Sequence, residues 1–116
     1  KKIISDVIND TRHNVGTNIN LAFNYGSRTE IVDAINKSKS TKTSIKSLSK
    51  NMYLPNLPDP DLIIRTGGEM RLSNFLLWQS AYSELFFTKI LWPNFKIKSL
   101  NKIIFYYLNR NRKYGK

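Results

Sequence analysis

The 116-residue sequence contains no cysteine and only one histidine, His13. Disulfide bonds and thiolate metal sites are therefore excluded, and so is a metal site built from several histidines. The sequence also lacks the run of about 20 apolar residues that a membrane-spanning helix needs. No segment has the pattern of a signal peptide. Together with the missing cysteines, this fits a reducing compartment, and we expect a cytoplasmic protein.

Acidic residues are scarce, since 8 Asp and Glu stand against 19 Lys and Arg and give a formal net charge of +11. Such an excess attracts anions, which include nucleic acids, acidic lipid headgroups and phosphorylated small molecules. The lysines are scattered through polar stretches such as 37–50 and are not interleaved with aromatic residues. The pattern therefore gives nucleic-acid binding only general support, and we expect no nucleic-acid partner.

The length and the 41% hydrophobic content allow one domain over residues 1–116, with a modest core. Apolar residues at helical spacing predict a helix over Lys2–Thr11, and alternation of polar and apolar residues predicts a strand over Asn18–Asn24. Ser27 and Glu30 have the spacing of a capping box at the start of the next helix. The remaining expected elements are a short helix at 45–54, strands at 61–65 and 84–88, a short helix at 74–79 and a final helix capped by Ser99. This order predicts an α/β fold with a parallel sheet.

The segment after the strand at 61–65 has the side chains of an anion-binding site. In an open α/β sheet, ligands collect at the carboxyl ends of the strands, where Arg65 is expected to lie. Two glycines follow, and without Cβ atoms their backbone amides can approach an anion closely. Two guanidinium groups, a hydroxyl and free helix-start amides around one cavity would bind a diphosphate well. The residues that supply these groups are Arg65, Gly67, Gly68, Arg71, Ser73 and Asn74.

Glu84 begins the next predicted strand and could give an oxygen ligand to a magnesium ion held against that diphosphate. Each piece has a plainer alternative. A strand-ending arginine is often a surface residue, Glu69 could simply pair with the arginines, and Glu84 could be a core carboxylate. The apolar run 75–78 could be ordinary core. The residues alone therefore support a phosphate-binding α/β domain and do not identify a reaction.

A long stretch of the sequence resembles a known family. D-P-D-L-I-I-R-T-G-G-E-M-R-L-S-N-F-L-L-W-Q-S-A-Y-S-E-L-F-F-T-K-I-L-W-P-N-F (Asp59–Phe95) resembles the second signature of undecaprenyl diphosphate synthases and other cis-prenyltransferases nearly residue for residue. Upstream, N-I-N-L-A-F-N-Y-G-S-R-T-E-I-V-D-A (Asn18–Ala34) is similar to a strand, a turn and a helix of that family. The end, Asn109–Gly115, resembles its closing helix. The resemblance covers nearly the whole chain in consistent order.

The resemblance implies an enzyme that adds isopentenyl diphosphate units to an allylic diphosphate of the farnesyl type, making a cis double bond each time. By position, Arg65, Arg71 and Ser73 would hold the diphosphate of isopentenyl diphosphate. Leu72 would contribute mainly its backbone, and Glu84 would be a ligand of Mg²⁺. Glu69 would orient the arginines, and both Glu69 and Asn74 would contact the binding residues and not the substrate itself. The family also implies a homodimer, with peripheral membrane association possible through the lipid product.

The sequence departs from the family at one important point. The family's first signature, Asp-Gly-Asn-Gly-Arg-Trp, and its tunnel-forming helices have no counterpart in this sequence. The family's catalytic aspartate belongs to that signature, so no catalytic residue is assigned here. We therefore expect an incomplete enzyme, inactive alone, that is either a fragment or one piece of a split chain. A silent partner subunit of a prenyltransferase is the alternative, and a basic nucleic-acid-binding module is a third possibility.

Overall fold

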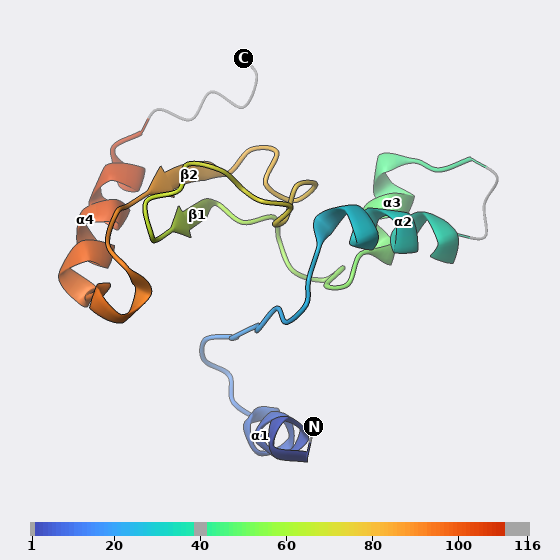
Figure 1. The fold of residues 1–116 in the computed structure, drawn as a ribbon. Helices are drawn as coiled ribbons and strands as arrows, with labels where there is room; N and C mark the ends of the chain where they lie inside the picture. Colours follow the sequence, from blue (N-terminus) through green and yellow to red (C-terminus); the bar gives the residue numbers. More distant parts are fainter. Residues whose placement is uncertain (1, 39–41, 111–116) are drawn as a thin grey trace.

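The computed structural model describes residues 2–38 and 42–110 of the chain. Within these ranges the chain forms helices and one two-stranded sheet (Figure 1). The elements in order are α1 (Lys2–Thr11), α2 (Ser27–Lys37), α3 (Ile45–Asn51), β1 (Leu62–Arg65), β2 (Glu84–Phe87), the 3₁₀ helix η1 (Trp92–Asn94) and α4 (Ile97–Leu108). The predicted α/β class is confirmed.

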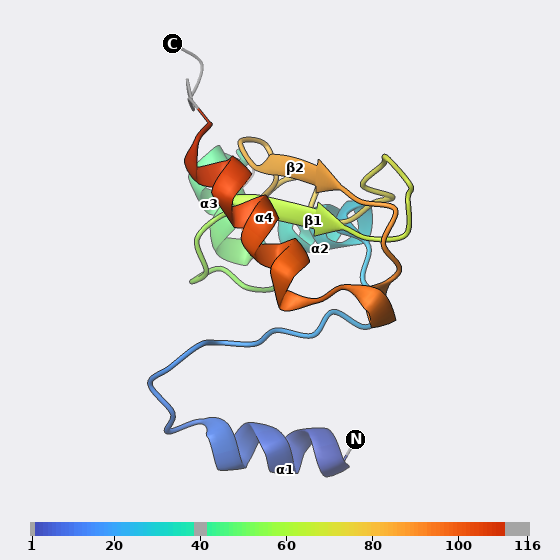
Figure 2. The same ribbon diagram turned by 90° about the vertical axis from the view of Figure 1, so that its left-hand side faces the viewer.

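β1 and β2 pair in parallel, with Leu62 opposite Glu84 and Arg65 opposite Phe87. Both strands were predicted from short runs of apolar residues, and each is one residue shorter than expected. α4 packs on one face of the pair, where Phe86 and Tyr106 place their ring centroids 6.2 Å apart. Figure 2 shows α4 in front of the strands, with α2 and α3 behind them. The strand pair therefore lies between α4 on one side and α2 and α3 on the other.

The core on the α2–α3 side consists of Ala34, Leu48 and Met52. Ile31 and Trp78 pack against this cluster, and the Trp78 indole Nε1 donates a hydrogen bond of 3.2 Å to Ser49 Oγ. Burial of such side chains is the main favourable term in folding. Because Trp78 lies in the connection between β1 and β2, this cluster anchors that connection on the two helices.

α1 has the predicted bounds, and none of its residues is buried. It lies apart from the rest of the described chain in both ribbon views (Figures 1 and 2). The apolar side chains of its helical stripe, Ile3, Ile4, Val7 and Ile8, are all more than half exposed. Among the described residues, no helix combines the length and the apolar character needed to cross a bilayer.

The strand predicted at 18–24 is wrong. This segment has no regular secondary structure, and Ile19, Leu21 and Phe23 are all largely exposed. Alternation of polar and apolar residues suits a strand, but a strand also needs a neighbour that completes its backbone hydrogen bonds. The sheet of the described residues contains β1 and β2 alone.

Two predicted helix caps are also wrong. Ser27 is the first helical residue of α2, and Gly26 precedes it at the cap position without a side-chain hydrogen bond. Ser99 is the third residue of α4, which begins at Ile97. A capping box occurs instead at α3, where Ser44 and Ser47 bond each other's backbone amides. Asn109 and Arg110 follow α4, and the rest of the segment that resembles the family's closing helix lies outside the described residues.

Candidate functional site: an anion pocket at the end of β1

Arg65 is the last residue of β1, as expected for a residue that faces a ligand at the strand's carboxyl end. Its guanidinium Nη1 donates a hydrogen bond of 2.9 Å to Ser73 Oγ and also bonds the backbone oxygen of Arg71. These bonds fold the 71–73 segment back over the end of the strand. Arg65 thus holds the Ser73 side chain and the backbone at Arg71 in place.

A pocket of about 400 Å³ lies at this end of β1. The predicted anion ligands Arg65, Arg71 and Ser73 all line it, as does Leu72. The remaining lining residues are Ile63, Ile64, Thr66 and Phe75. The geometry therefore brings two guanidinium groups and one hydroxyl together, which is the donor set expected for a phosphate or diphosphate group.

Glu69 forms an ion pair with Arg71, with 2.5 Å between Oε2 and Nη1. Both side chains are more than half exposed, at 53% and 63%, so water screens the pair and it adds little to stability. The carboxylate also reduces the net charge of the pocket. An anion bound by Arg71 would have to displace or share this contact.

The two glycines after β1 act differently from the prediction. The amide of Gly67 donates to Ile90 O at 3.0 Å, and that of Gly68 donates to Thr88 O at 2.9 Å. These amides are thus occupied by the segment after β2 and do not point to an anion. Both residues have positive φ, +92° and +88°, in the region where glycine avoids the steric cost of a Cβ atom. Glycine is needed here for the turn.

Asn74 does not begin a helix, so the predicted free helix-start amides are absent from 74–79, which forms turns. Ser73, Asn74 and Leu76 all have φ between +46° and +65°, a left-handed conformation that non-glycine residues rarely adopt. Asn74 instead caps α2, because its Oδ1 accepts from the Arg28 amide at 2.9 Å and its backbone oxygen accepts from Ser27 at 2.8 Å. A Cβ atom added to Gly26 would lie 2.8 Å from Asn74 Nδ2, so glycine permits this close approach.

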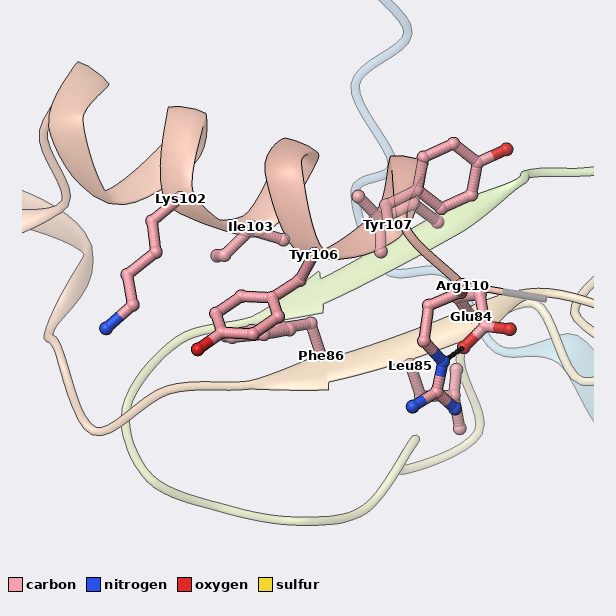
Figure 3. Close-up of a pocket in the computed structure, with 9 residues that line it drawn as sticks. Glu84, Leu85, Phe86, Lys102, Ile103, Tyr106, Tyr107 and Arg110 are labelled. Carbon is pink, nitrogen blue, oxygen red and sulfur yellow. Dashed lines mark ion pairs between the residues drawn. The ribbon is translucent and has the colours of Figure 1, made fainter.

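Glu84 lies away from Arg65 and Arg71. In the parallel register it is opposite Leu62, whereas Arg65 is three residues further along β1, about 10 Å at the usual rise per residue. Glu84 lines a different pocket of about 330 Å³ between β2 and α4, with Phe86, Tyr106 and Arg110 (Figure 3). Its Oε2 lies 3.3 Å from Arg110 Nε. The described residues therefore do not bring Glu84 together with Arg65 and Arg71, and its role as a magnesium ligand stays a prediction.

Magnesium often takes one or two carboxylates together with substrate phosphates and water. Glu84 has the right oxygen chemistry to be one such ligand. Within residues 2–38 and 42–110, however, no three His, Cys, Asp or Glu side chains gather closely enough to hold a metal ion. Further ligands would have to come from the substrate or from outside the described part of the chain.

Glu30 was not predicted to have a functional role, and it is buried, with 2% of its surface exposed. Its Oε2 accepts hydrogen bonds from Tyr25 Oη at 2.5 Å and from Gln79 Nε2 at 3.1 Å. Its Oε1 accepts from the Tyr53 amide at 2.9 Å. Burial and the bond to the Glu30 carboxylate raise the pKa of Tyr25 to about 12. The only local hint was the Tyr25-Gly26 turn ahead of an acidic first helical turn.

Comparison with known proteins places this pocket in context. Residues 1–115 match the family model described as "Putative undecaprenyl diphosphate synthase". The chain is 51% identical to the isoprenyl transferase of Fusobacterium nucleatum over 99% of its own length and 51% of that protein. It is 44% identical to a Micrococcus luteus protein named ditrans,polycis-undecaprenyl-diphosphate synthase, (2E,6E)-farnesyl-diphosphate specific, over 99% of this chain and 50% of that one.

The fold agrees with these sequence relationships. The crystal structure of a probable undecaprenyl diphosphate synthase from Campylobacter jejuni superposes with a TM-score of 0.88 at 38% identity, over 99% of this chain and 55% of that one. The chain spans about half the length of the curated relatives that it matches. On the family model, the identities and the shared fold, the chain belongs to the undecaprenyl diphosphate synthase family.

Proposed function

We propose that the chain is the isopentenyl diphosphate-binding part of a cis-prenyltransferase. The reaction condenses isopentenyl diphosphate with an allylic diphosphate and yields a long polyprenyl diphosphate of the undecaprenyl type, a lipid carrier for cell-wall synthesis. Family membership and the names of the relatives support this proposal. The observation that carries it is the convergence of Arg65, Arg71 and Ser73 on one pocket at the end of β1.

In this proposal the pocket holds the diphosphate of isopentenyl diphosphate. Arginine forks match phosphate oxygens in pairs, and the Ser73 hydroxyl can donate once an anion competes for Arg65. The apolar residues Leu72 and Phe75 at the same pocket offer a surface for the isopentenyl carbons. Holding the donor in place converts an encounter of two molecules into a positioned reaction, which accounts for much of the acceleration in such enzymes.

We propose that Glu84 supplies one ligand of Mg²⁺, an ion that would neutralise charge on the diphosphates when bound. Because Glu84 and the arginines lie at opposite ends of the strand pair, further parts of an assembly would have to bring the metal and the substrate together. We also propose that this assembly is a homodimer, and that it associates with the membrane surface through its lipid product.

Glu84→Gln is expected to weaken the effect of magnesium. Adding Mg²⁺ should tighten the binding of isopentenyl diphosphate to the active assembly. In the presence of Mg²⁺ the variant should bind isopentenyl diphosphate about tenfold more weakly than the wild type, as expected for the loss of one charge-assisted contact of about 1.5 kcal/mol. Calorimetric titration with and without Mg²⁺ measures this. Asp10→Asn on the exposed α1 removes the same charge elsewhere and serves as the control. An equal response to magnesium in both variants would remove Glu84 from the metal site.

The charge of +11 supports one other function, binding of nucleic acid. Our proposal predicts that inorganic diphosphate binding is lost when Arg65 and Arg71 are both replaced by alanine. It also predicts that duplex DNA binds only non-specifically, with a Kd of about 10⁻⁴–10⁻⁶ M at physiological salt. Fluorescence anisotropy with labelled DNA and calorimetry with diphosphate test the two side by side. Submicromolar DNA binding that survives both substitutions, without diphosphate binding, would favour the nucleic-acid alternative.

A further inference from the structure

The buried carboxylate of Glu30 connects three segments that are distant in sequence. It accepts hydrogen bonds from Tyr25 ahead of α2, from the Tyr53 amide after α3, and from Gln79 in the connection between β1 and β2. An ionised carboxylate is costly to bury unless such donors satisfy it. These three donors use both oxygens, so Glu30 holds the three segments in one arrangement.

Two of these contacts lead to the anion pocket. The Tyr25 ring meets Phe75 edge-on, with ring centroids 5.7 Å apart and an interplanar angle of 78°. Phe75 lines the pocket beside Ser73 and Arg71. Gln79 lies in the same connection, four residues after Phe75, and its Nε2 donates to Glu30. Glu30 therefore does not line the pocket, but it bonds Tyr25, which packs on the lining residue Phe75, and Gln79, which follows Phe75 in the same connection.

The segment between these two contacts needs such support. Ser73, Asn74 and Leu76 have positive φ, a backbone conformation that costs energy in non-glycine residues and persists only where neighbours enforce it. α2 provides two further constraints, because the Leu77 amide donates to Ser27 Oγ at 3.0 Å and Asn74 caps the helix. Strain of this kind gathers at binding sites, where it fixes the direction of a ligand-contacting side chain.

We propose that Glu30 is a positioning residue for the anion pocket. Through Tyr25 and Gln79 it holds Phe75 and the 73–77 backbone in the strained conformation that turns Ser73 toward Arg65. The proposal rests on the proposed function for the identity of the ligand, but the placement of the loop is independent of it. An ordinary structural role for Glu30 would predict a loss of stability without a specific change at the pocket.

The test compares Glu30→Ala with Asp33→Ala in the full 116-residue chain. Asp33 is the control, since it lies one turn further along α2 and also bonds a tyrosine, the Tyr53 hydroxyl, but it is only half-buried and does not line the pocket. Two quantities are measured at a temperature where both variants are folded by circular dichroism. They are the affinity for inorganic diphosphate by calorimetry and the hydrogen-exchange protection of the Leu77 amide.

Glu30→Ala is expected to lower diphosphate affinity about tenfold and to reduce Leu77 protection, while Asp33→Ala changes neither by more than about twofold. Glu30→Gln should recover most of the affinity. Gln79 Oε1 is buried without a hydrogen-bond partner among the described residues, so this amide can turn over and accept from a glutamine at position 30. If Glu30→Ala does not fold, Tyr25→Phe replaces it, since it removes the hydroxyl bond but keeps the ring against Phe75 and should cost about threefold.

The outcomes separate the two proposals. Unchanged affinity and unchanged Leu77 protection in folded Glu30→Ala or Tyr25→Phe would overturn the positioning role, even if the wild-type chain binds diphosphate. Equal losses in Glu30→Ala and Asp33→Ala would also overturn it, because they would indicate general destabilisation. If the wild-type chain binds no diphosphate, the proposed function fails, and Leu77 protection alone decides the positioning role.

Discussion

Purified alone, the 116-residue chain is expected to turn over no isopentenyl diphosphate, and turnover should appear when the part of the Fusobacterium nucleatum isoprenyl transferase that it does not cover is added. The chain covers 51% of that relative. It has the pocket proposed to hold one diphosphate but no Asp-Gly-Asn-Gly-Arg-Trp signature, and no group of three metal-ligating side chains exists in its described part. Both substrates and a metal must meet for transfer, so a single half-site cannot catalyse it.

The two parts should associate because the chain exposes apolar surface that a partner can cover. The apolar stripe of α1 is largely exposed, and Trp92 is 75% exposed near α4. Large exposed apolar patches are unusual in a monomer and mark interaction surfaces. At 51% identity, much of the matching surface of the relative should be retained.

The measurement is incorporation of radiolabelled isopentenyl diphosphate into extractable polyprenyl diphosphate, with farnesyl diphosphate and Mg²⁺ present. We expect a rise of at least about 10³-fold over either part alone, the scale of removing transition-state charge stabilisation from such a site. Adding the Arg65→Ala chain is the control and should give little turnover. Turnover by the 116-residue chain alone would show that the account of the missing signature is wrong.

One further outcome would support a different role. If the combined parts stay inactive but the chain raises the activity or stability of a complete prenyltransferase, it acts as a silent partner subunit. Association with a partner stabilises both by mass action, so the melting temperature of the mixture would rise with concentration.

The elements that the sequence predicted correctly depend on short-range patterns. α1 was recovered with its bounds because its apolar residues recur at helical spacing. β1 and β2 were recovered within one residue because each is a short apolar run between turn signals. The 18–24 segment had an equally good alternation, but a local pattern cannot tell whether a strand finds a neighbour.

The helix predicted at 74–79, in the connection between β1 and β2, was wrong because contacts distant in sequence determine the backbone there. The apolar run 74–79 resembles a helix, yet Asn74 bonds Arg28, 46 positions away, and Leu77 bonds Ser27, 50 positions away. These contacts impose the left-handed backbone that no window of neighbouring residues reveals. The same holds for Glu30, whose partners lie up to 49 positions away.

The candidate site was predicted in part. The rule that ligands bind at the carboxyl ends of parallel strands correctly placed Arg65 beside Arg71 and Ser73. Glu84 could not be placed by that rule, because its distance from Arg65 depends on the register of β2 against β1. Glu84 begins β2, as predicted, and only the register shows that it lies level with Leu62 and not with Arg65.

Arg65→Ala is expected to have the largest effect of any single substitution on substrate binding. Arg65 is half-buried at the strand end, contacts Ser73 and the Arg71 backbone, and lines the pocket. Its removal deletes one anion contact and also frees the 71–73 segment. The affinity for isopentenyl diphosphate should fall by about 1.5–3 kcal/mol, roughly 10- to 150-fold. Arg65→Lys keeps the charge but loses the forked guanidinium, so its affinity for isopentenyl diphosphate should lie between those of the wild type and Arg65→Ala.

Calorimetric titration of isopentenyl diphosphate into the wild-type chain, Arg65→Ala and Arg12→Ala tests the central claim most directly. Arg12 is exposed, bonds only its neighbour His13 among the described contacts, and lies far along the chain from β1, so its loss changes the charge equally. We predict that Arg12→Ala binds within about twofold of the wild type, while Arg65→Ala loses at least tenfold. Equal affinities for Arg65→Ala and Arg12→Ala would contradict a diphosphate site at the end of β1.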